Sequence, residues 1–148
     1  MKKKIIAALC VALLILSAVG VAGIRFIRSE RKTDSENYLL AAKNAAYEIG
    51  EYIETGDENS FSFAAADIIQ MNNMTSSASS VVSPDNAEII ENAATVLSYN
   101  PLKLSCEAER LRTALEIIAE NGEDVDYAYA QIQIALTNSD LLNNKQYS

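Results

Sequence analysis

The sequence that decides the architecture is Ile5 to Ile24, IIAALCVALLILSAVGVAGI, twenty residues without a charged side chain. Three lysines at positions 2–4 precede it, and Arg25 and Arg28 follow it. At about 1.5 Å per residue, a helix of this length spans roughly 30 Å, the thickness of the hydrocarbon core of a bilayer. A helix also satisfies its own backbone polar groups in lipid. We therefore expect a transmembrane anchor over residues 5–27 that contacts membrane lipid.

A cleaved export signal is the alternative explanation of this segment. The lysines form a basic N-terminal region, and the small residues Ala18, Gly20 and Ala22 resemble those at cleavage sites. The apolar run nevertheless continues to Ile24, and no polar region separates it from Arg25. This continuity favours a segment that is retained as a signal-anchor.

Basic residues lie on both flanks of the apolar segment, so their balance gives little information about orientation. The lysines at 2–4 and the α-amino group compete with Arg25, Arg28, Arg31 and Lys32. The ordinary behaviour of a basic and then apolar N-terminal segment leaves its N-terminus in the cytosol. We therefore expect a single-pass membrane protein with a cytoplasmic N-terminus and an extracytoplasmic C-terminal domain.

The rest of the 148-residue chain has room for one soluble domain. We expect a basic N-terminus (1–4), a basic juxtamembrane segment (28–33), an acidic helical bundle (34–143) and a frayed tail (144–148). Residues 33–148 carry nineteen acids and five Lys or Arg. Such a domain repels nucleic acid, so we expect a protein partner and no nucleic-acid partner. The alternative interpretation is that these acids only keep the domain soluble.

Missing residue types exclude many enzyme classes. The chain contains no histidine, so it has no Ser-His-Asp or Cys-His pair and no imidazole ligand for a metal. Its five glycines are too scattered for a phosphate-binding loop. We therefore expect no enzyme, no catalytic residues, no metal site and no cofactor, and the sequence identifies no ligand-binding residues.

The apolar residues beyond the anchor recur at steps of three and four, which is typical of amphipathic helices. The expected inward positions in the five segments are Tyr38, Ala42, Ala45, Ile49 and Tyr52; Phe61, Ala64 or Ala65, Ile68 and Met71; Ala87, Ile90, Ala94 and Leu97; Leu104, Ala108, Leu111, Leu115 and Ile118; and Tyr129, Ile132 and Ala135 or Leu136. No segment shows a convincing strand pattern. The sequence predicts an all-α fold, an N-terminal transmembrane helix followed by an up-and-down bundle of four to five helices.

Residues that favour helix ends predict the boundaries. A capping box at Thr33–Glu36 would start a new helix, but the absence of Pro and Gly between Gly23 and Gly50 favours one helix continuous with the anchor. The other expected signals are a stop at Gly56 with a cap at Asp57, a serine-rich loop from Thr75 to Ser83, a start at Ser83-Pro84, an end near Tyr99, a cap at Asn100, a stop at Gly122 and a start at Glu123–Asp126.

Three groups of residues are candidates for function. Glu123, Asp124 and Asp126 suit Ca²⁺, but the position of the neighbouring glycine does not fit an EF-hand, so helix capping is favoured. Cys106, outside the anchor, is a candidate redox or intermolecular thiol, and burial as a small apolar residue is favoured. The tyrosines could line a pocket between helices, and semi-buried packing is favoured; the set is Tyr38, Tyr47, Tyr52, Tyr127 and Tyr129.

The run Tyr52-Ile53-Glu54-Thr55-Gly56-Asp57-Glu58 follows an anchor and a helix. In this it resembles the helix-to-helix turn of extracytoplasmic four-helix-bundle sensor domains in bacterial chemoreceptors and sensor kinases. Those receptors return through a second membrane helix to a cytosolic signalling module, and neither occurs before Ser148. The resemblance therefore implies at most a stand-alone relative, and we transfer no ligand-binding residue.

These observations predict a bacterial, membrane-anchored, extracytoplasmic helical bundle that acts as an interaction or accessory module. The alternative is a small-ligand sensor or binding domain that works through a separate signalling partner.

Overall fold

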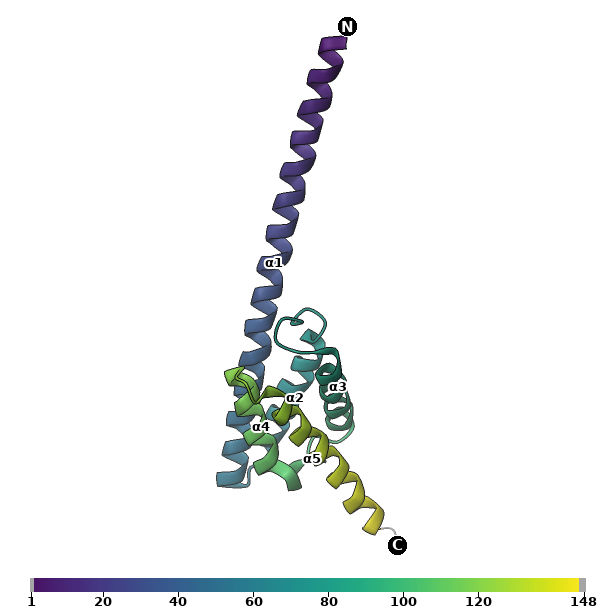
Figure 1. The fold of residues 1–148 in the computed structure, drawn as a ribbon. Coiled ribbons are helices and arrows are strands. Elements are labelled where there is room, and N and C mark those ends of the chain that lie inside the picture. Colours follow the sequence, from purple (N-terminus) through teal and green to yellow (C-terminus); the bar gives the residue numbers. More distant parts are fainter. Residues whose placement is uncertain (1, 147–148) are drawn as a thin grey trace.

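The computed structural model describes residues 2–146, and within them the side chains of residues 23, 24 and 26–140. All regular structure in this part of the chain is helical, which confirms the all-α fold (Figure 1). The elements are α1 (Lys2–Thr55), α2 (Glu58–Met74), α3 (Pro84–Tyr99), the short 3₁₀ helix η1 (Ser105–Glu107), α4 (Ala108–Glu120) and α5 (Val125–Gln146).

The helices form a closed ring around one core. The chain reverses direction from each long helix to the next (Figure 1). Helix α1 packs against α2 and α4, α2 against α3, and α5 against both α3 and α4. The consecutive helices α3 and α4 are therefore not main packing partners, because α5 lies between them. This order brings α4 beside α1, far from it in sequence.

Helix α1 is continuous through the point where a second helix could have begun. The Thr33–Glu36 segment lies inside α1, with Thr33 Oγ1 donating to the Ser29 carbonyl at 3.1 Å instead of capping a new helix. The expectation of one continuous helix is confirmed over this segment. The N-terminal part of α1 extends away from the bundle (Figure 1).

The anchor expected over residues 5–27 falls almost wholly outside the described side chains. Among the residues that are described, no helix combines the length and the apolar character needed to cross a bilayer.

The core follows the predicted inward positions closely. Nearly all of them are buried, and the exceptions are Tyr52 and Ala87, which are partly exposed. The largest buried side chains come from all five long helices: Tyr38 and Ile49 in α1, Phe61 and Met71 in α2, Ile90 and Leu97 in α3, Leu111, Leu115 and Ile118 in α4, and Tyr129 and Ile132 in α5. Burial of such residues stabilises the fold by about 1.5–3 kcal/mol each.

Several predicted helix ends are confirmed. Gly56 adopts a φ of 73°, the left-handed conformation that ends α1. Asp57 then caps α2, its Oδ1 accepting from the Asn59 backbone N–H at 3.1 Å. Ser83 caps α3 through a 3.2 Å bond from the Asn86 N–H, with Pro84 in the first turn.

Two predicted boundaries of the fourth helix are wrong. The Asn100 side chain accepts from the Leu102 N–H at 3.1 Å, so it stabilises a local turn rather than a long helix. Turns and η1 occupy residues 101–107, and α4 begins only at Ala108. At the other end Asn121, not Gly122, takes the left-handed position with φ of 50°. Asn tolerates this conformation better than most residues do.

The serine-rich loop from Thr75 to Ser83 is confirmed as a loop, but it is held against α1. Ser35 Oγ donates to the Arg31 carbonyl at 2.8 Å and lies 2.6 Å from Ser80 Oγ. Because the Ser35 proton is already used, Ser80 is the donor in the second bond. Ala78 and Val82 of the loop are buried in the core.

Candidate functional site

The five candidate tyrosines, for which semi-buried packing was favoured over a shared pocket, are distributed over three environments. Tyr38 and Tyr129 are fully buried, and their hydroxyl oxygens lie 2.8 Å apart. Burial raises the pKa of Tyr38, and it raises that of Tyr129 to about 12. Tyr47 is exposed, and its neighbours are described below. Tyr52 and the exposed Tyr127 border a hollow beside η1.

The acids before α5 lie at a helix start. Helix α5 begins at Val125, and Asp126 lies in its first turn. Asp126 Oδ1 accepts from Asn86 Nδ2 at 2.9 Å, which joins α5 to α3. Glu123 and Asp124 are exposed. Among the described residues, no group of three acid or thiol side chains is arranged to hold a metal ion.

Cys106 is exposed in η1, so the expectation of a buried, apolar role is wrong. The 3₁₀ turn explains this, because Leu104 and Ala108 on either side take the inward positions. The thiol borders the same hollow as Tyr52 and Tyr127.

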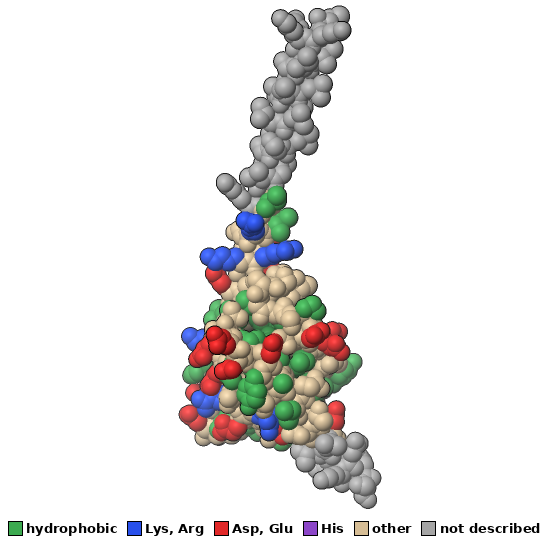
Figure 2. Space-filling view, viewed as in Figure 1, with side chains coloured by type: hydrophobic (Ala, Val, Ile, Leu, Met, Phe, Trp, Pro, Cys, Tyr) green, Lys and Arg blue, Asp and Glu red, His purple; other side chains and the backbone are tan. Residues whose placement is uncertain are grey.

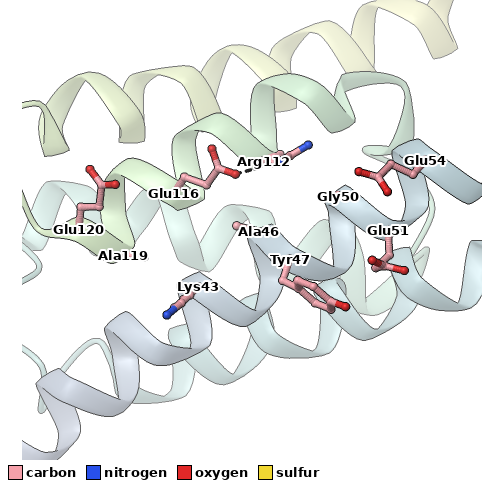
Figure 3. A pocket seen from close by; sticks show the side chains of 10 residues that line it. All are labelled: Lys43, Ala46, Tyr47, Gly50, Glu51, Glu54, Arg112, Glu116, Ala119 and Glu120. Atoms are coloured by element: carbon pink, nitrogen blue, oxygen red, sulfur yellow. Dashed lines mark hydrogen bonds and ion pairs between the residues drawn. The ribbon is translucent and has the colours of Figure 1, made fainter.

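The residues of α1 and α4 form a groove of about 560 Å³ between the two helices (Figure 3). We call it the α1–α4 groove. The residues that line it are Lys43, Ala46, Tyr47, Gly50, Glu51 and Glu54 from α1, and Arg112, Glu116, Ala119 and Glu120 from α4. A volume of this size is within the range of small-molecule sites in proteins.

Small residues create the space. Ala46, Gly50 and Ala119 lie where the two helices pack together, and larger side chains rise on both sides. A Cβ atom placed on Gly50 would lie 3.5 Å from Cζ of Arg112. This is an ordinary van der Waals distance, so the guanidinium lies over Gly50 and leaves room for a methyl group at that position.

Arg112 brings one cation into an acidic groove. Its Nε donates to Glu116 Oε1 at 3.0 Å, and this pair is marked in Figure 3. Glu116, followed by Glu109 and Glu54, raises the pKa of Arg112 because negative charges favour the protonated guanidinium. Among ion pairs of the described residues, Glu51, Glu54 and Glu120 take part in none. The groove contains four carboxylates and two cations.

Tyr47 and Glu51 lie next to each other along α1 on the rim of the groove (Figure 3). The charge of Glu51 is the main cause that raises the pKa of the Tyr47 hydroxyl, with smaller effects from Glu48 and Glu54. The side chain of Tyr47 is 64% exposed. The rim therefore combines an accessible aromatic face with a local excess of negative charge.

Sequence reasoning did not find this groove. The groove forms only because α4 lies beside α1. The order of the helices along the chain does not indicate that these two helices are neighbours. Two signals were nevertheless present. Gly50 interrupts an otherwise good helix, which often marks a close packing contact, and Glu51 and Glu54 share a face with Tyr47.

Comparison with protein-family models, with curated proteins and with solved structures finds no match for this chain.

Proposed function

We propose that this chain is a single-pass membrane protein whose acidic helical bundle lies outside the cytoplasm and serves as an interaction or accessory module. The main support is the character of α1 beyond the bundle. Ile24, Phe26 and Ile27 are 57%, 63% and 51% exposed. Exposed apolar side chains in such a series are typical of surfaces covered by lipid or protein. Ile24 ends the uncharged sequence that begins at Ile5, and Phe26 and Ile27 follow it between Arg25 and Arg28.

The charge distribution supports the orientation of the bundle relative to the membrane. Basic side chains gather on α1 where it leaves the bundle, whereas acidic side chains are spread over the bundle face in Figure 2. Arg28, Arg31 and Lys32 suit the headgroup region, where long basic side chains reach the interface. An acidic body is repelled by anionic lipids, so it would remain beside the membrane as a projecting module.

A small-ligand binding or sensor function is the second candidate, and the α1–α4 groove favours it. One wall of this groove belongs to α1, the helix that continues toward the proposed anchor. Occupation of the groove could therefore be communicated along α1 to a separate partner. We propose no enzyme activity, because no residue constellation in the sequence suits catalysis.

The membrane proposal is tested on the full chain expressed in bacterial cells. Membranes are washed with alkaline carbonate, which removes peripheral proteins, and intact spheroplasts are treated with protease. We expect the chain to stay in the membrane fraction after the carbonate wash, and we expect the protease to digest the bundle from outside the spheroplasts. A freely soluble chain shortened at its N-terminus would show that the leader is cleaved, and a protected bundle would reverse the orientation.

A further inference from the structure

We propose that the outward face of α1 is a pairing surface for a second copy of this chain, and that the two α1 helices lie side by side in parallel as a left-handed coiled coil. The inference rests on the proposed membrane anchorage, because two chains inserted in one membrane in the same way point in the same direction. We call this surface the outer seam of α1. It consists of Phe26, Glu30, Thr33, Asn37, Leu40, Asn44 and Tyr47.

The outer seam follows a seven-residue repeat. Its members are separated alternately by four and by three residues. This is the spacing of the a and d positions of a coiled coil, and it places Phe26, Leu40 and Tyr47 at d positions. A strict repeat of about 3.5 residues per turn, against about 3.6 in a straight helix, indicates a left-handed pair. Helix α1 is unbroken over the whole seam (Figure 1).

The bundle does not cover the outer seam. All seven of its side chains are exposed, whereas the inward-facing residues on the other side of α1 are buried. Leu40 is 54% and Tyr47 64% exposed, and the Tyr47 ring points away from α4 (Figure 3). Five of the nine large apolar side chains that are exposed in the described part of the chain belong to α1. Such a concentration on one helix is typical of a contact surface.

The polar members of the seam favour a second α1 helix over a purely apolar partner. Asn37 and Asn44 take a positions and are exposed. At an a position, asparagine fixes the register and the number of helices, at a cost in stability. In a symmetric parallel pair each asparagine lies beside its own counterpart, so two amides that can bond to each other meet at each level. An apolar partner would leave both amides without a bonding group.

Charges beside the seam are complementary in the parallel arrangement. Lys43 precedes an a position and Glu48 follows a d position, so they take the g and e positions that form salt bridges between helices. Lys43 of one copy then faces Glu48 of the second copy, and symmetry repeats this pair. Within the described part of its own chain, Lys43 takes part in no ion pair. Glu30 opposes pairing at its own level, because two carboxylates meet there.

The pairing needs the anchor as well as the outer seam. A specific interface of ordinary size buries about 800 Å² on each partner, and one aromatic side chain buries about 150–250 Å². Phe26, Leu40 and Tyr47 therefore do not supply enough area by themselves. Continued toward the N-terminus, the same alternation meets only apolar positions. These are Ile5, Leu9, Ala12, Leu16, Val19 and Gly23.

The test is disulfide formation by the full chain in bacterial membranes. Every variant carries Cys10→Ala and Cys106→Ser, so the introduced thiol is the only one. Under mild oxidation, Leu40→Cys and Asn44→Cys should form covalent dimers, because a and d residues lie beside their counterparts in a parallel pair. The controls are Lys32→Cys, exposed on α1 outside the seam, and Phe63→Cys, exposed on α2. They should give several-fold less dimer.

A second measurement follows the uncrosslinked chain in detergent micelles by light scattering. Leu40→Glu should weaken dimer formation by about tenfold or more, since it places facing charges in the seam. The matched control Phe63→Glu alters a similarly exposed apolar residue, 62% against 54%, and should leave the dimer unchanged. Glu30→Gln should strengthen the dimer. Circular dichroism verifies that each variant is folded.

Equal cross-linking at seam and control positions, no dimer at the seam positions, or a covalent product other than two copies of this chain would overturn the pairing. Fractionation of the same cells tests the anchorage separately. A membrane-bound chain that does not cross-link at the seam contradicts the pairing alone. A soluble chain that does cross-link there contradicts the anchorage alone.

Discussion

The hydroxyl oxygens of Tyr38 and Tyr129 lie 2.8 Å apart in the centre of the bundle, and neither side chain is exposed to solvent. This contact joins α1 to α5, two helices separated by most of the domain sequence. Either oxygen can act as donor to the other. The pair therefore connects the helix that leads toward the proposed anchor with the helix that closes the ring.

Replacing both of these tyrosines should cost less than the sum of the two single replacements. Tyr38→Phe or Tyr129→Phe leaves a buried hydroxyl without its partner and should lower the free energy of unfolding by about 1–3 kcal/mol. The double variant should be less destabilised than the sum of the two, because no unpaired hydroxyl remains. Urea unfolding of the full chain in micelles, followed by circular dichroism, measures this. Strictly additive losses would show that the hydroxyls are not coupled.

The same pair predicts a loss of stability in alkali. Burial is the main cause that raises the pKa of Tyr129 from 10.0 to about 12, with a smaller effect from Asp126, and burial also raises that of Tyr38. The unfolded chain then loses its phenol protons first as the pH rises. The stabilising contribution is complete below pH 10 and declines as the pH rises toward 12. Across this pH window, the melting temperature of the unaltered chain should fall more steeply than that of the double phenylalanine variant. Parallel curves would show that the two buried phenols do not cause the loss of stability.

Leu111 tests the packing of α4 against the core. The side chain is 1% exposed, so Leu111→Ala removes buried apolar volume and should cost about 2–5 kcal/mol. Thr113→Ala, on the exposed side of the same helix, should change the stability by less than about 0.5 kcal/mol. Chemical unfolding of both variants gives the comparison. Similar effects from the two substitutions would mean that the inward face of α4 is wrongly assigned.

Gly50 and Gly56 should respond in opposite ways to alanine. A Cβ at position 50 meets Arg112 only at ordinary contact distance, so Gly50→Ala should gain about 0.5–1 kcal/mol from helix propensity. Gly56 has a φ of 73°, so Gly56→Ala should lose about 1–2 kcal/mol from left-handed backbone strain. Thermal melting of both variants measures the signs. A loss at position 50 would show that the groove floor cannot accept a methyl group.

The sequence was sufficient to predict the core, because helix periodicity alone determines which side chains face inward. Residues such as Ile68 and Leu115 were therefore placed correctly. It was less informative between helices. The turn at Asn100 depends on a local hydrogen bond from the Leu102 N–H, and the exposure of Cys106 depends on a 3₁₀ turn. Neither feature is visible in the spacing of apolar residues, which placed Leu104 in a regular helix.

Lateral neighbours were not predictable for a different reason. Amphipathic patterns show that each helix buries one face, but they do not say which helix covers it. The pairing of α1 with α4 arises because α5 inserts between α3 and α4. The α1–α4 groove and the Tyr38–Tyr129 contact both follow from that order, so neither could be read from spacing alone.

The most direct test of the membrane placement uses the exposed thiol of Cys106. A membrane-impermeant maleimide is added to intact spheroplasts, and the same reaction is repeated after permeabilisation, with Cys106→Ser as the control. A single-pass anchor with an extracytoplasmic bundle predicts full labelling of the membrane-bound chain before permeabilisation and none in the control. Labelling that appears only after permeabilisation, or that is found on a shortened soluble chain, would contradict it.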